Sequence, residues 1–219
     1  MSIQGDLFTS ATEEIGDNFS FEKQLYASGV RIVAGTDEAG RGPLAGPVVA
    51  ACVVLPRDCD CTVFKDSKKL SGAARENLYQ LLRELDAMIG VGVCSVEEID
   101  RLNILHASLL AMKKAMENLP LVPDFLLVDG KFTIPHQVSQ QSLVKGESRS
   151  ASIAAASIVA KEERDRMMHD LDREYPQYHF ARHKGYPTAE HRALIEKHGP
   201  SPVHRRSFRG VREFLGKDD

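Results

Sequence analysis

The stretch that decides the fold is Arg31-Ile32-Val33-Ala34-Gly35-Thr36-Asp37-Glu38-Ala39-Gly40-Arg41-Gly42-Pro43. Its first half is mainly apolar and predicts a buried strand over 32–36, and two adjacent carboxylates, Asp37 and Glu38, follow directly. Adjacent carboxylates at the end of a buried strand repel each other, and a cation relieves that repulsion. Hard divalent ions such as Mg²⁺ or Mn²⁺ prefer oxygen ligands. The stretch therefore predicts a strand that ends at a metal site.

Two glycines around one arginine, Gly40-Arg41-Gly42, come next. Glycine lets a ligand approach the backbone closely, and arginine adds a cationic fork. The segment 40–45 formally fits the dinucleotide fingerprint G-x-G-x-x-A, but Pro43 and Pro47 bracket it and a β run follows where the fingerprint needs a helix. No Gly-Lys-Ser/Thr follows, so a P-loop is excluded as well. Acidic residues beside an anion-friendly loop point to metal-assisted chemistry on a phosphate ester.

The rest of the chain predicts an α/β fold, a mixed five-stranded sheet flanked by helices with a C-terminal helical extension. Further strands are expected over 48–55, 88–95, 125–128 and 141–144. Helices are expected over 71–85, 103–119, 150–173 and 189–198, with a short piece at 211–215. The first half of the 150–173 helix consists of very small residues, which permits close approach to a sheet or another helix.

Composition divides the chain into three regions. Residues 1–30 carry a charge balance of −4 and predict a flexible acidic leader with a short helix near 19–26. Residues 31–174 would form the catalytic core, and residues 175–219 a basic helical region packed on it. The net charge of −3 hides a balance of +4 over residues 176–219. A basic end favours a local polyanion contact, although charge alone suits a solvated helical face equally well.

Several protein classes are excluded by composition. An apolar content of 42% and a charged content of 27% are ordinary for a soluble globular protein. We find no apolar run of 18 residues and no secretory signal, so we expect no membrane contact. The four cysteines lack zinc-finger spacing and indicate reduced thiols in a cytoplasmic protein.

Two more acids extend the predicted metal site. Asp129 ends an apolar strand as Asp37 does, and adjacent strand ends would place the two side by side. Glu147 lies at the start of the long helix, where the helix dipole favours an acid. Together with Glu38, such a cluster could hold two ions about 3.5–4 Å apart for in-line phosphodiester hydrolysis. Any one of these acids could equally belong to a turn or cap a helix.

Three further segments offer groups suited to nucleic acid. Tyr186, in His183-Lys184-Gly185-Tyr186-Pro187-Thr188, suits base stacking or sugar reading, although Gly-Tyr-Pro is also an ordinary turn. The segments 66–70 and 204–209 add phosphate donors, or equally surface charge.

These segments together resemble the ribonuclease HII family, the bacterial type 2 ribonucleases H, over about residues 31–212. The resemblance rests on an ordered set of motifs: Asp-Glu-Ala-Gly-Arg-Gly-Pro at 37–43, Asp-Ser-Lys-Lys-Leu at 66–70, Leu-Asn-Ile-Leu-His at 102–106, Val-Asp-Gly at 128–130, Lys-Gly-Glu-Ser-Arg at 145–149, Ala-Ala-Ser-Ile-Val-Ala-Lys at 155–161, His-Lys-Gly-Tyr-Pro-Thr at 183–188 and His-Arg-Arg-Ser-Phe at 204–208. Because one such string is weak and the ordered set is specific, the set carries the assignment.

The resemblance implies a ribonuclease H-like fold and an endonuclease that cleaves RNA in RNA–DNA hybrids and single ribonucleotides in duplex DNA. The products would carry a 3′-hydroxyl and a 5′-phosphate, and the cofactor would be Mn²⁺ or Mg²⁺. The implied catalytic metal ligands are Asp37, Glu38, Asp129 and Glu147. The family usually has aspartate at the fourth position, so the longer Glu147 could change metal preference or rate. The implied substrate-binding residues are Gly40, Arg41, Gly42, Lys68, Lys184 and Tyr186, where the glycines read the 2′-hydroxyl and Tyr186 tests the sugar at the RNA–DNA junction.

Two alternatives stay open on the acids alone: another metal-dependent nuclease of the same fold, such as a junction resolvase, and a catalytically silent hybrid-binding module. A separate hypothesis concerns Gln4-Gly5-Asp6-Leu7-Phe8, which resembles the peptide by which bacterial replication and repair proteins dock on the DNA sliding clamp. Gln4, Leu7 and Phe8 would anchor it in a hydrophobic groove, although an ordinary terminus explains the segment equally well. We expect a monomer.

Overall fold

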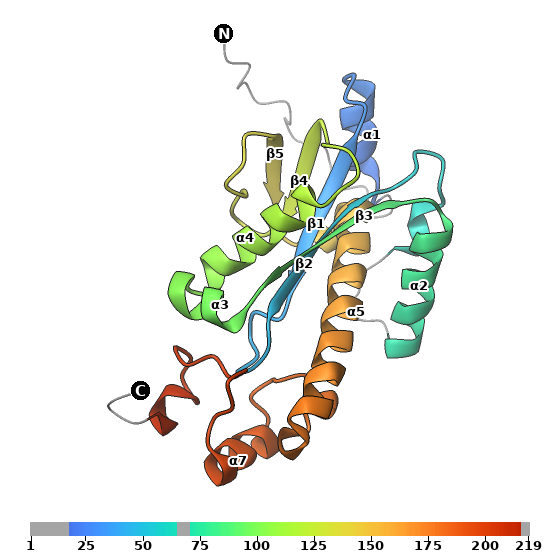
Figure 1. Ribbon diagram of the computed structural model, residues 1–219. Coiled ribbons are helices and arrows are strands. Elements are labelled where there is room, and N and C mark those ends of the chain that lie inside the picture. Colours follow the sequence, from blue (N-terminus) through green and yellow to red (C-terminus); the bar gives the residue numbers. More distant parts are fainter. Residues whose placement is uncertain (1–17, 65–70, 216–219) are drawn as a thin grey trace.

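The computed structural model describes residues 18–64 and 71–215, which form one sheet between two helical layers (Figure 1). The strands are β1 (Val33–Ala39), β2 (Val48–Val54), β3 (Met88–Cys94), β4 (Phe125–Asp129) and β5 (Ser139–Leu143). They lie in the order β3-β2-β1-β4-β5. Strand β2 pairs antiparallel with β1 and β3, whereas β4 pairs parallel with β1 and β5. The predicted mixed five-stranded sheet is therefore confirmed.

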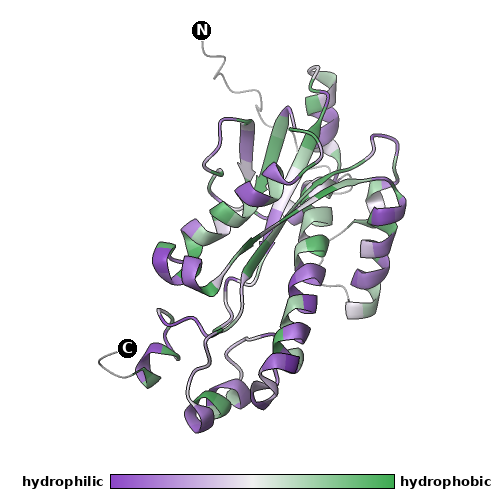
Figure 2. Cartoon of the chain, in the orientation of Figure 1, coloured by the Kyte–Doolittle hydropathy of each residue, from purple (hydrophilic) through white to green (hydrophobic). Residues whose placement is uncertain are grey.

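Helices cover both faces of this sheet. They are α1 (Ser20–Ala27), α2 (Gly72–Glu84), α3 (Val96–Leu102), α4 (Ile104–Glu117), α5 (Ala151–Glu174), α6 (Phe180–His183) and α7 (Ala189–His198), with short 3₁₀ turns at Cys61–Val63, Gly146–Ser148, Pro176–Tyr178 and Arg212–Phe214. Helix α4 packs on one face, and α5 packs on the other with α2 beside it. Figure 2 shows the strands other than β5 as largely hydrophobic, and α2 and the C-terminal half of α5 as largely hydrophilic. The core therefore has two layers, one on each side of the sheet.

Small residues let α5 lie close to β1. Every residue from Ala151 to Ala160 is buried. A Cβ on Gly35 would lie 2.3 Å from the backbone of Ser152 and Ile153, so only glycine fits there. The expected close approach is confirmed, and it holds α5 across β1, the strand that carries Asp37.

The expected flexible leader is wrong for its described part, residues 18–30. The predicted short helix forms as α1, but it packs on the core, with Phe19 and Leu25 only 5% and 6% exposed. Glu22 is fully buried, and its Oε1 accepts hydrogen bonds from Ser150 Oγ at 2.6 Å and Ser152 N at 3.0 Å. This carboxylate thereby satisfies donors at the N-terminus of α5, which is why α1 belongs to the folded core.

Helix α3 was not predicted, although the sequence signals it. Ser95 and Glu98 form a reciprocal capping box at its start. Asn103, with φ of 67°, separates α3 from α4, and its side chain accepts hydrogen bonds from the amides of Leu105 and His106. The polar sequence Glu97-Glu98-Ile99-Asp100-Arg101 has only one buried apolar position, so its helical period is hard to detect.

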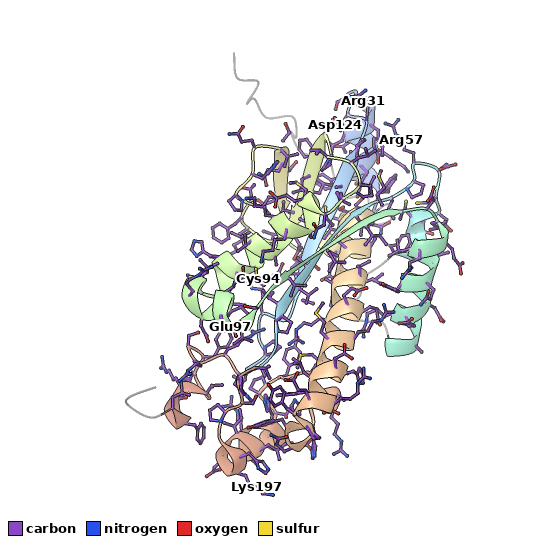
Figure 3. The ribbon with its side chains drawn as sticks, in the orientation of Figure 1. Arg31, Arg57, Cys94, Glu97, Asp124 and Lys197 are labelled. Atoms are coloured by element: carbon purple, nitrogen blue, oxygen red, sulfur yellow. The ribbon has the colours of Figure 1, made fainter. Side chains whose placement is uncertain are left out.

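The two ends of the sheet differ in character. At the end where β1 begins, Asp124 Oδ2 accepts hydrogen bonds from the amides of Arg31 and Ile32, and Arg57 donates to the Arg31 carbonyl (Figure 3). The opposite end, where β1 and β4 finish, faces the C-terminal helical region. Within the ranges given above, no helix has the length and apolar character needed to cross a membrane.

Candidate active site

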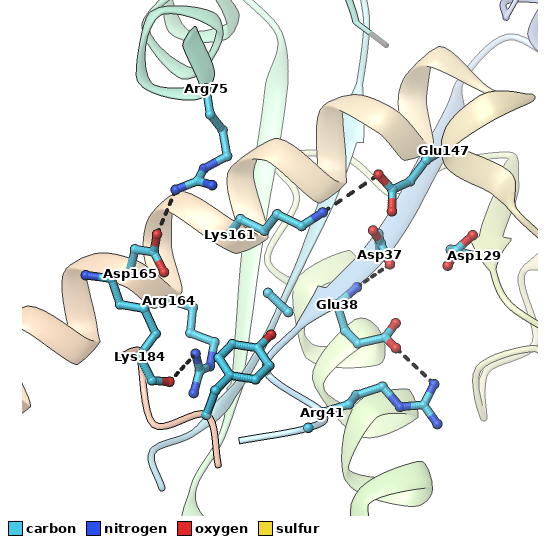
Figure 4. Close-up of a pocket in the computed structure, with 14 residues that line it drawn as sticks. Asp37, Glu38, Arg41, Arg75, Asp129, Glu147, Lys161, Arg164, Asp165 and Lys184 are labelled. Atoms are coloured by element: carbon cyan, nitrogen blue, oxygen red, sulfur yellow. Dashed lines mark hydrogen bonds and ion pairs between the residues drawn. The ribbon is translucent and has the colours of Figure 1, made fainter. Parts of the chain in front are cut away.

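Asp37 and Asp129 lie side by side near the carboxyl ends of β1 and β4 (Figure 4). Their strands are parallel neighbours whose register pairs Thr36 with Val128, and the two aspartates are the next residues. Asp37 Oδ1 accepts a hydrogen bond of 2.7 Å from the Glu38 amide, and Asp129 Oδ1 accepts one of 2.7 Å from the Gly146 amide. The predicted meeting of two strand-end acids is confirmed.

Glu38 and Glu147 complete an acidic group in the same pocket. Glu147 lies in the 3₁₀ turn before α5 and is 6% exposed, and its Oε2 lies 3.7 Å from Lys161 Nζ. Glu38 Oε1 accepts a hydrogen bond of 3.1 Å from Arg41 Nη1. The open pocket has a volume of about 480 Å³. It is lined by Asp37, Glu38, Ala39, Gly40, Arg41, Gly42, Arg75, Asp129, Glu147, Lys161, Arg164, Asp165, Lys184 and Tyr186.

At the acidic end of the pocket, Lys161 and Arg41 do not fully offset the effects of burial and of the neighbouring negative charges. Burial raises the pKa of Asp37 well above its ordinary value, and the negative charges of Glu38 and Asp129 raise it further. Lys161 and a hydrogen bond with Ser157 act in the opposite direction without cancelling the rise. Burial also raises the pKa of Glu38, although Arg41 opposes it. A bound cation would reverse these shifts, because it favours the ionised carboxylates.

The four acids offer the donor set of a hard divalent ion, all of it carboxylate oxygen. They are not a preformed coordination shell, because the described residues contain no cluster of three His, Cys, Asp or Glu side chains arranged to hold a metal ion. Their oxygens instead contact Arg41, Lys161 and backbone amides. The residues fit a divalent ion chemically, and side-chain rotation is needed to gather their oxygens around it.

The glycine corner, residues 40–42, forms the wall next to the acids. Gly40 has φ of +95°, a conformation that side chains rarely adopt, and a Cβ there would overlap Arg164. A Cβ on Gly42 would lie 3.5 Å from the Tyr186 ring, so the corner faces that ring directly. A hydrogen bond of 2.8 Å from the Leu44 amide to the Gly185 carbonyl joins the two segments. A sugar held there would be close to both backbone and ring.

Among the other predicted site residues, Lys184 lines the pocket and its Nζ lies 2.8 Å from His169 Nε2. Lys68 and the proposed clamp anchors Gln4, Leu7 and Phe8 lie outside the described residues.

One face of α5 carries charged side chains into the pocket, which was not predicted from the sequence. Lys161, Arg164 and Asp165 all line the pocket, together with Arg75 from α2, which donates to Asp165. Positions 157, 161, 164, 165 and 168 recur at the spacing of one helical face, a signal that the sequence did offer. The acids therefore occupy one end of the pocket, and basic side chains extend toward the other (Figure 4).

Comparison with known proteins identifies the family to which this chain is similar. The family model described as Ribonuclease HII matches residues 34–211. A ribonuclease HII from Desulfotalea psychrophila is 58% identical over 202 residues, covering 91% of this chain and 90% of that relative.

Solved structures of similar proteins share the fold. The ribonuclease H2 of Pyrococcus horikoshii superimposes with a TM-score of 0.69 at 27% identity, covering 84% of this chain and 97% of that one. The RNase HII of Archaeoglobus fulgidus, solved as a complex with PCNA, gives 0.66 at 26% identity, covering 82% and 96%. An RNase HIII solved in complex with Mn²⁺ gives 0.64 at 20% identity, covering 83% and 68%, which shows a shared fold alone.

Proposed function

Because the chain belongs to the ribonuclease HII family and is an endoribonuclease of the ribonuclease H type, we propose that it cleaves the RNA strand of RNA–DNA hybrids and single ribonucleotides embedded in duplex DNA. The products would be a 3′-hydroxyl and a 5′-phosphate. The observation that carries this proposal is one pocket in which Asp37, Glu38, Asp129 and Glu147 adjoin the glycine corner and Tyr186. Chemistry on a phosphodiester and recognition of its sugar can then occur at the same nucleotide.

The four acids would hold the divalent ion, Mn²⁺ or Mg²⁺. When bound, such an ion activates the attacking water and stabilises the leaving 3′ oxygen. Asp37 and Asp129 come from rigid neighbouring strands, so their positions are well defined. Glu147 is held by the turn before α5. The ammonium of Lys161 lies beside its carboxylate and partly balances its negative charge.

The sugar would be read by the glycine corner. RNA differs from DNA at one nucleotide only in the 2′-hydroxyl, so a reader must approach that group closely. Glycine at 42 omits a side chain that would point toward the Tyr186 ring and hinder the approach, and Tyr186, 48% exposed, offers a ring on the other side. Glycine at 40 leaves room for the Arg164 side chain behind the corner. Lys184, and Lys68 outside the described residues, would contact backbone phosphates.

One assay separates this proposal from the alternatives. Three duplexes are offered with Mg²⁺ or Mn²⁺: one with a single ribonucleotide, one of DNA alone and one four-way junction. We expect cutting only at the ribonucleotide. Asp37→Asn and Asp129→Asn should abolish cutting at little cost in affinity, whereas Asp170→Asn, an exposed acid on α5, should leave it intact. Cutting of the junction would favour a resolvase, and binding without cutting a silent module.

A partner is proposed for residues 4–8. The archaeal relative solved with PCNA is a ribonuclease HII bound to a clamp, which supports a clamp contact for this chain. Docking there would bring the enzyme to newly replicated DNA, where ribonucleotide excision repair takes place, in the cytoplasm of a bacterial cell. A pull-down with the bacterial sliding clamp should succeed with the intact monomer and fail after residues 1–9 are removed. Equal capture of both proteins would end the idea.

A further inference from the structure

Two buried arginines lie behind the glycine corner. Arg205 is 0% exposed and Arg164 is 2% exposed. Their guanidinium groups donate to backbone carbonyls. Arg205 donates to Gly40 O at 2.6 Å, Arg41 O at 3.1 Å, Gly46 O at 2.9 and 3.0 Å and Pro47 O at 3.2 Å. Arg164 donates to Pro47 O at 3.0 Å, Lys184 O at 3.0 Å and Ala45 O at 3.2 Å. Two planar forks therefore gather carbonyls from the segment 40–47 and the carbonyl of Lys184.

This arrangement is expensive in free energy. Burial, with a smaller contribution from the nearby charge of Arg164, lowers the pKa of Arg205 to about 9. Burial likewise lowers the pKa of Arg164 to about 10. Two buried like charges held by neutral carbonyls are a poor way to stabilise a fold, because desolvation of each charge is only partly offset. This costly pair lies directly behind the glycine corner and donates to its carbonyls, which points to a role in holding that corner.

The carbonyl contacts fix the direction of the amides. In a planar trans peptide the C=O of one residue and the N–H of the next point in opposite directions. Because Arg205 takes the carbonyls of Gly40 and Arg41, the amides of Arg41 and Gly42 point away from Arg205. Across the described ranges those two amides donate no hydrogen bond within the chain. The corner therefore presents two adjacent donors with two positive charges behind them, a seat for an oxygen acceptor.

The same arginines set the distance between the corner and the ring. Arg164 donates to Lys184 O on the segment that carries Tyr186 and to Ala45 O on the corner side. The Arg205 amide donates to Leu44 O at 2.8 Å, which ties its own segment to the turn. The width of the sugar slot, the space between the glycine corner and the Tyr186 ring, therefore depends on both guanidinium groups.

We propose that Arg205, assisted by Arg164, is a specificity-determining positioning residue, which turns the amides of Arg41 and Gly42 toward the ribose and holds Tyr186 opposite them. This inference rests on the proposed function. It concerns how ribose is distinguished from deoxyribose, and not the cutting step.

The test is a ratio of affinities. Binding to a duplex with one ribonucleotide and to the matching DNA duplex is measured without added divalent ion, so that no strand is cut. Partial unfolding weakens both bindings equally, whereas a misaligned corner changes their ratio. Arg205→Lys keeps the charge but loses the fork. We expect the ratio of its affinities for the ribonucleotide duplex and the DNA duplex to fall about tenfold or more. The ratio for Arg164→Lys should also fall.

The control is Arg182→Lys, whose guanidinium is exposed and pairs with Glu190. It should retain the preference of the unaltered chain. A folded Arg205→Lys protein with unchanged preference overturns the inference while leaving the proposed function standing. A wild-type chain without preference that also fails to cut the ribonucleotide duplex refutes the proposed function instead.

A measurement on the unaltered chain covers the case in which both lysine variants fail to fold. Hydrogen exchange at the Arg41 and Gly42 amides should be fast in the free protein. It should slow on addition of the ribonucleotide duplex and slow less with the DNA duplex. Amides already protected in the free protein, or protected equally by both duplexes, would overturn the inference.

Discussion

Lys161 reaches from α5 into the acidic end of the pocket, where its Nζ lies 3.7 Å from Oε2 of Glu147. It also contacts the Ser157 hydroxyl, and its charge opposes the rise in the pKa of Asp37. The ammonium group of Lys161 thus partly neutralises carboxylates that a bound divalent ion would also neutralise. When an ion binds, this ammonium becomes a competitor for the same oxygens.

Lys161→Met should therefore lower the stability of the metal-free protein and increase the stabilisation that a divalent ion gives. We expect a loss of about 1–2 kcal/mol in the free energy of unfolding without divalent ion, or roughly 2–8 °C in melting temperature for a chain of this size. Mn²⁺ should raise the melting temperature more in the variant than in the wild type, because repulsion between the carboxylates is then relieved by the ion alone. Lys197→Met, an exposed lysine on α7, is the control. Equal metal-induced shifts in all three proteins would contradict this role.

Glu147 gives a second prediction, because its carboxylate reaches one methylene further than that of an aspartate. Glu147→Asp withdraws the carboxylate by about 1.5 Å, which lengthens the contact with Lys161. We expect activity within about tenfold of wild type and an altered ratio of Mg²⁺- to Mn²⁺-supported kcat/KM. Glu147→Gln, which loses the charge, should fall by about 100-fold or more. Glu190→Asp, an exposed site, serves for comparison. An unchanged metal ratio in Glu147→Asp would show that reach does not matter here.

The acidic site could be predicted because local pattern and topology agree. Asp37 and Asp129 each end an apolar run, and parallel neighbours place such ends together. The corner was predicted from its glycines, yet its support was not. Arg205 donates to backbone carbonyls more than 150 positions earlier in the chain, and backbone acceptors leave no pattern of partner side chains in a sequence. Lys161 was overlooked because one lysine in a charged helix resembles ordinary surface.

The burial of α1 leads to a stability prediction. Glu22 is fully buried, and burial raises its pKa, while Ser150 and Ser152 donate to it. Glu22→Ala removes the acceptor and leaves a cavity, so we expect a loss of about 2–4 kcal/mol in the free energy of unfolding. Urea unfolding at neutral pH measures it. Glu196→Ala, exposed on α7, should change stability by less than about 0.5 kcal/mol. An unchanged free energy of unfolding in Glu22→Ala would mean that α1 does not stabilise the core.

Three buried histidines make stability depend on pH. His191 and His204 lie with their Nε2 atoms 3.0 Å apart, and His183 stacks on His191 at 4.3 Å. Burial lowers the pKa of His191 to about 4 and that of His204 to about 3, and it lowers the pKa of His183 as well. In the unfolded chain each would titrate near 6.5. Below that pH the unfolded state binds more protons than the folded state. The contribution of these histidines to stability is therefore fully present above about pH 6.5 and is lost as the pH falls.

We expect the free energy of unfolding to drop by about 2–4 kcal/mol between pH 7 and pH 5, at up to about 1.4 kcal/mol per pH unit for each histidine. Urea midpoints at pH 7, 6 and 5 measure this drop. His204→Gln removes one titrating group and should give a shallower dependence, whereas His136→Gln, exposed beyond β4, should retain the full slope. If His204→Gln keeps the wild-type slope, the histidine cluster is not the cause.

Gly42 tests the sugar slot itself. Its φ lies outside the left-handed region, and an added Cβ would make an ordinary contact of 3.5 Å with Cε1 of Tyr186, so Gly42→Ala should fold with a melting temperature close to wild type. The methyl group would nevertheless occupy the space between corner and ring. We expect kcat/KM on the single-ribonucleotide duplex to fall about tenfold or more, because the ribose can no longer approach the backbone. Gly72→Ala is the matched control, since a Cβ at the start of α2 meets nothing within 4 Å. Full activity in Gly42→Ala would place the ribose elsewhere in the pocket and leave the corner only a structural role.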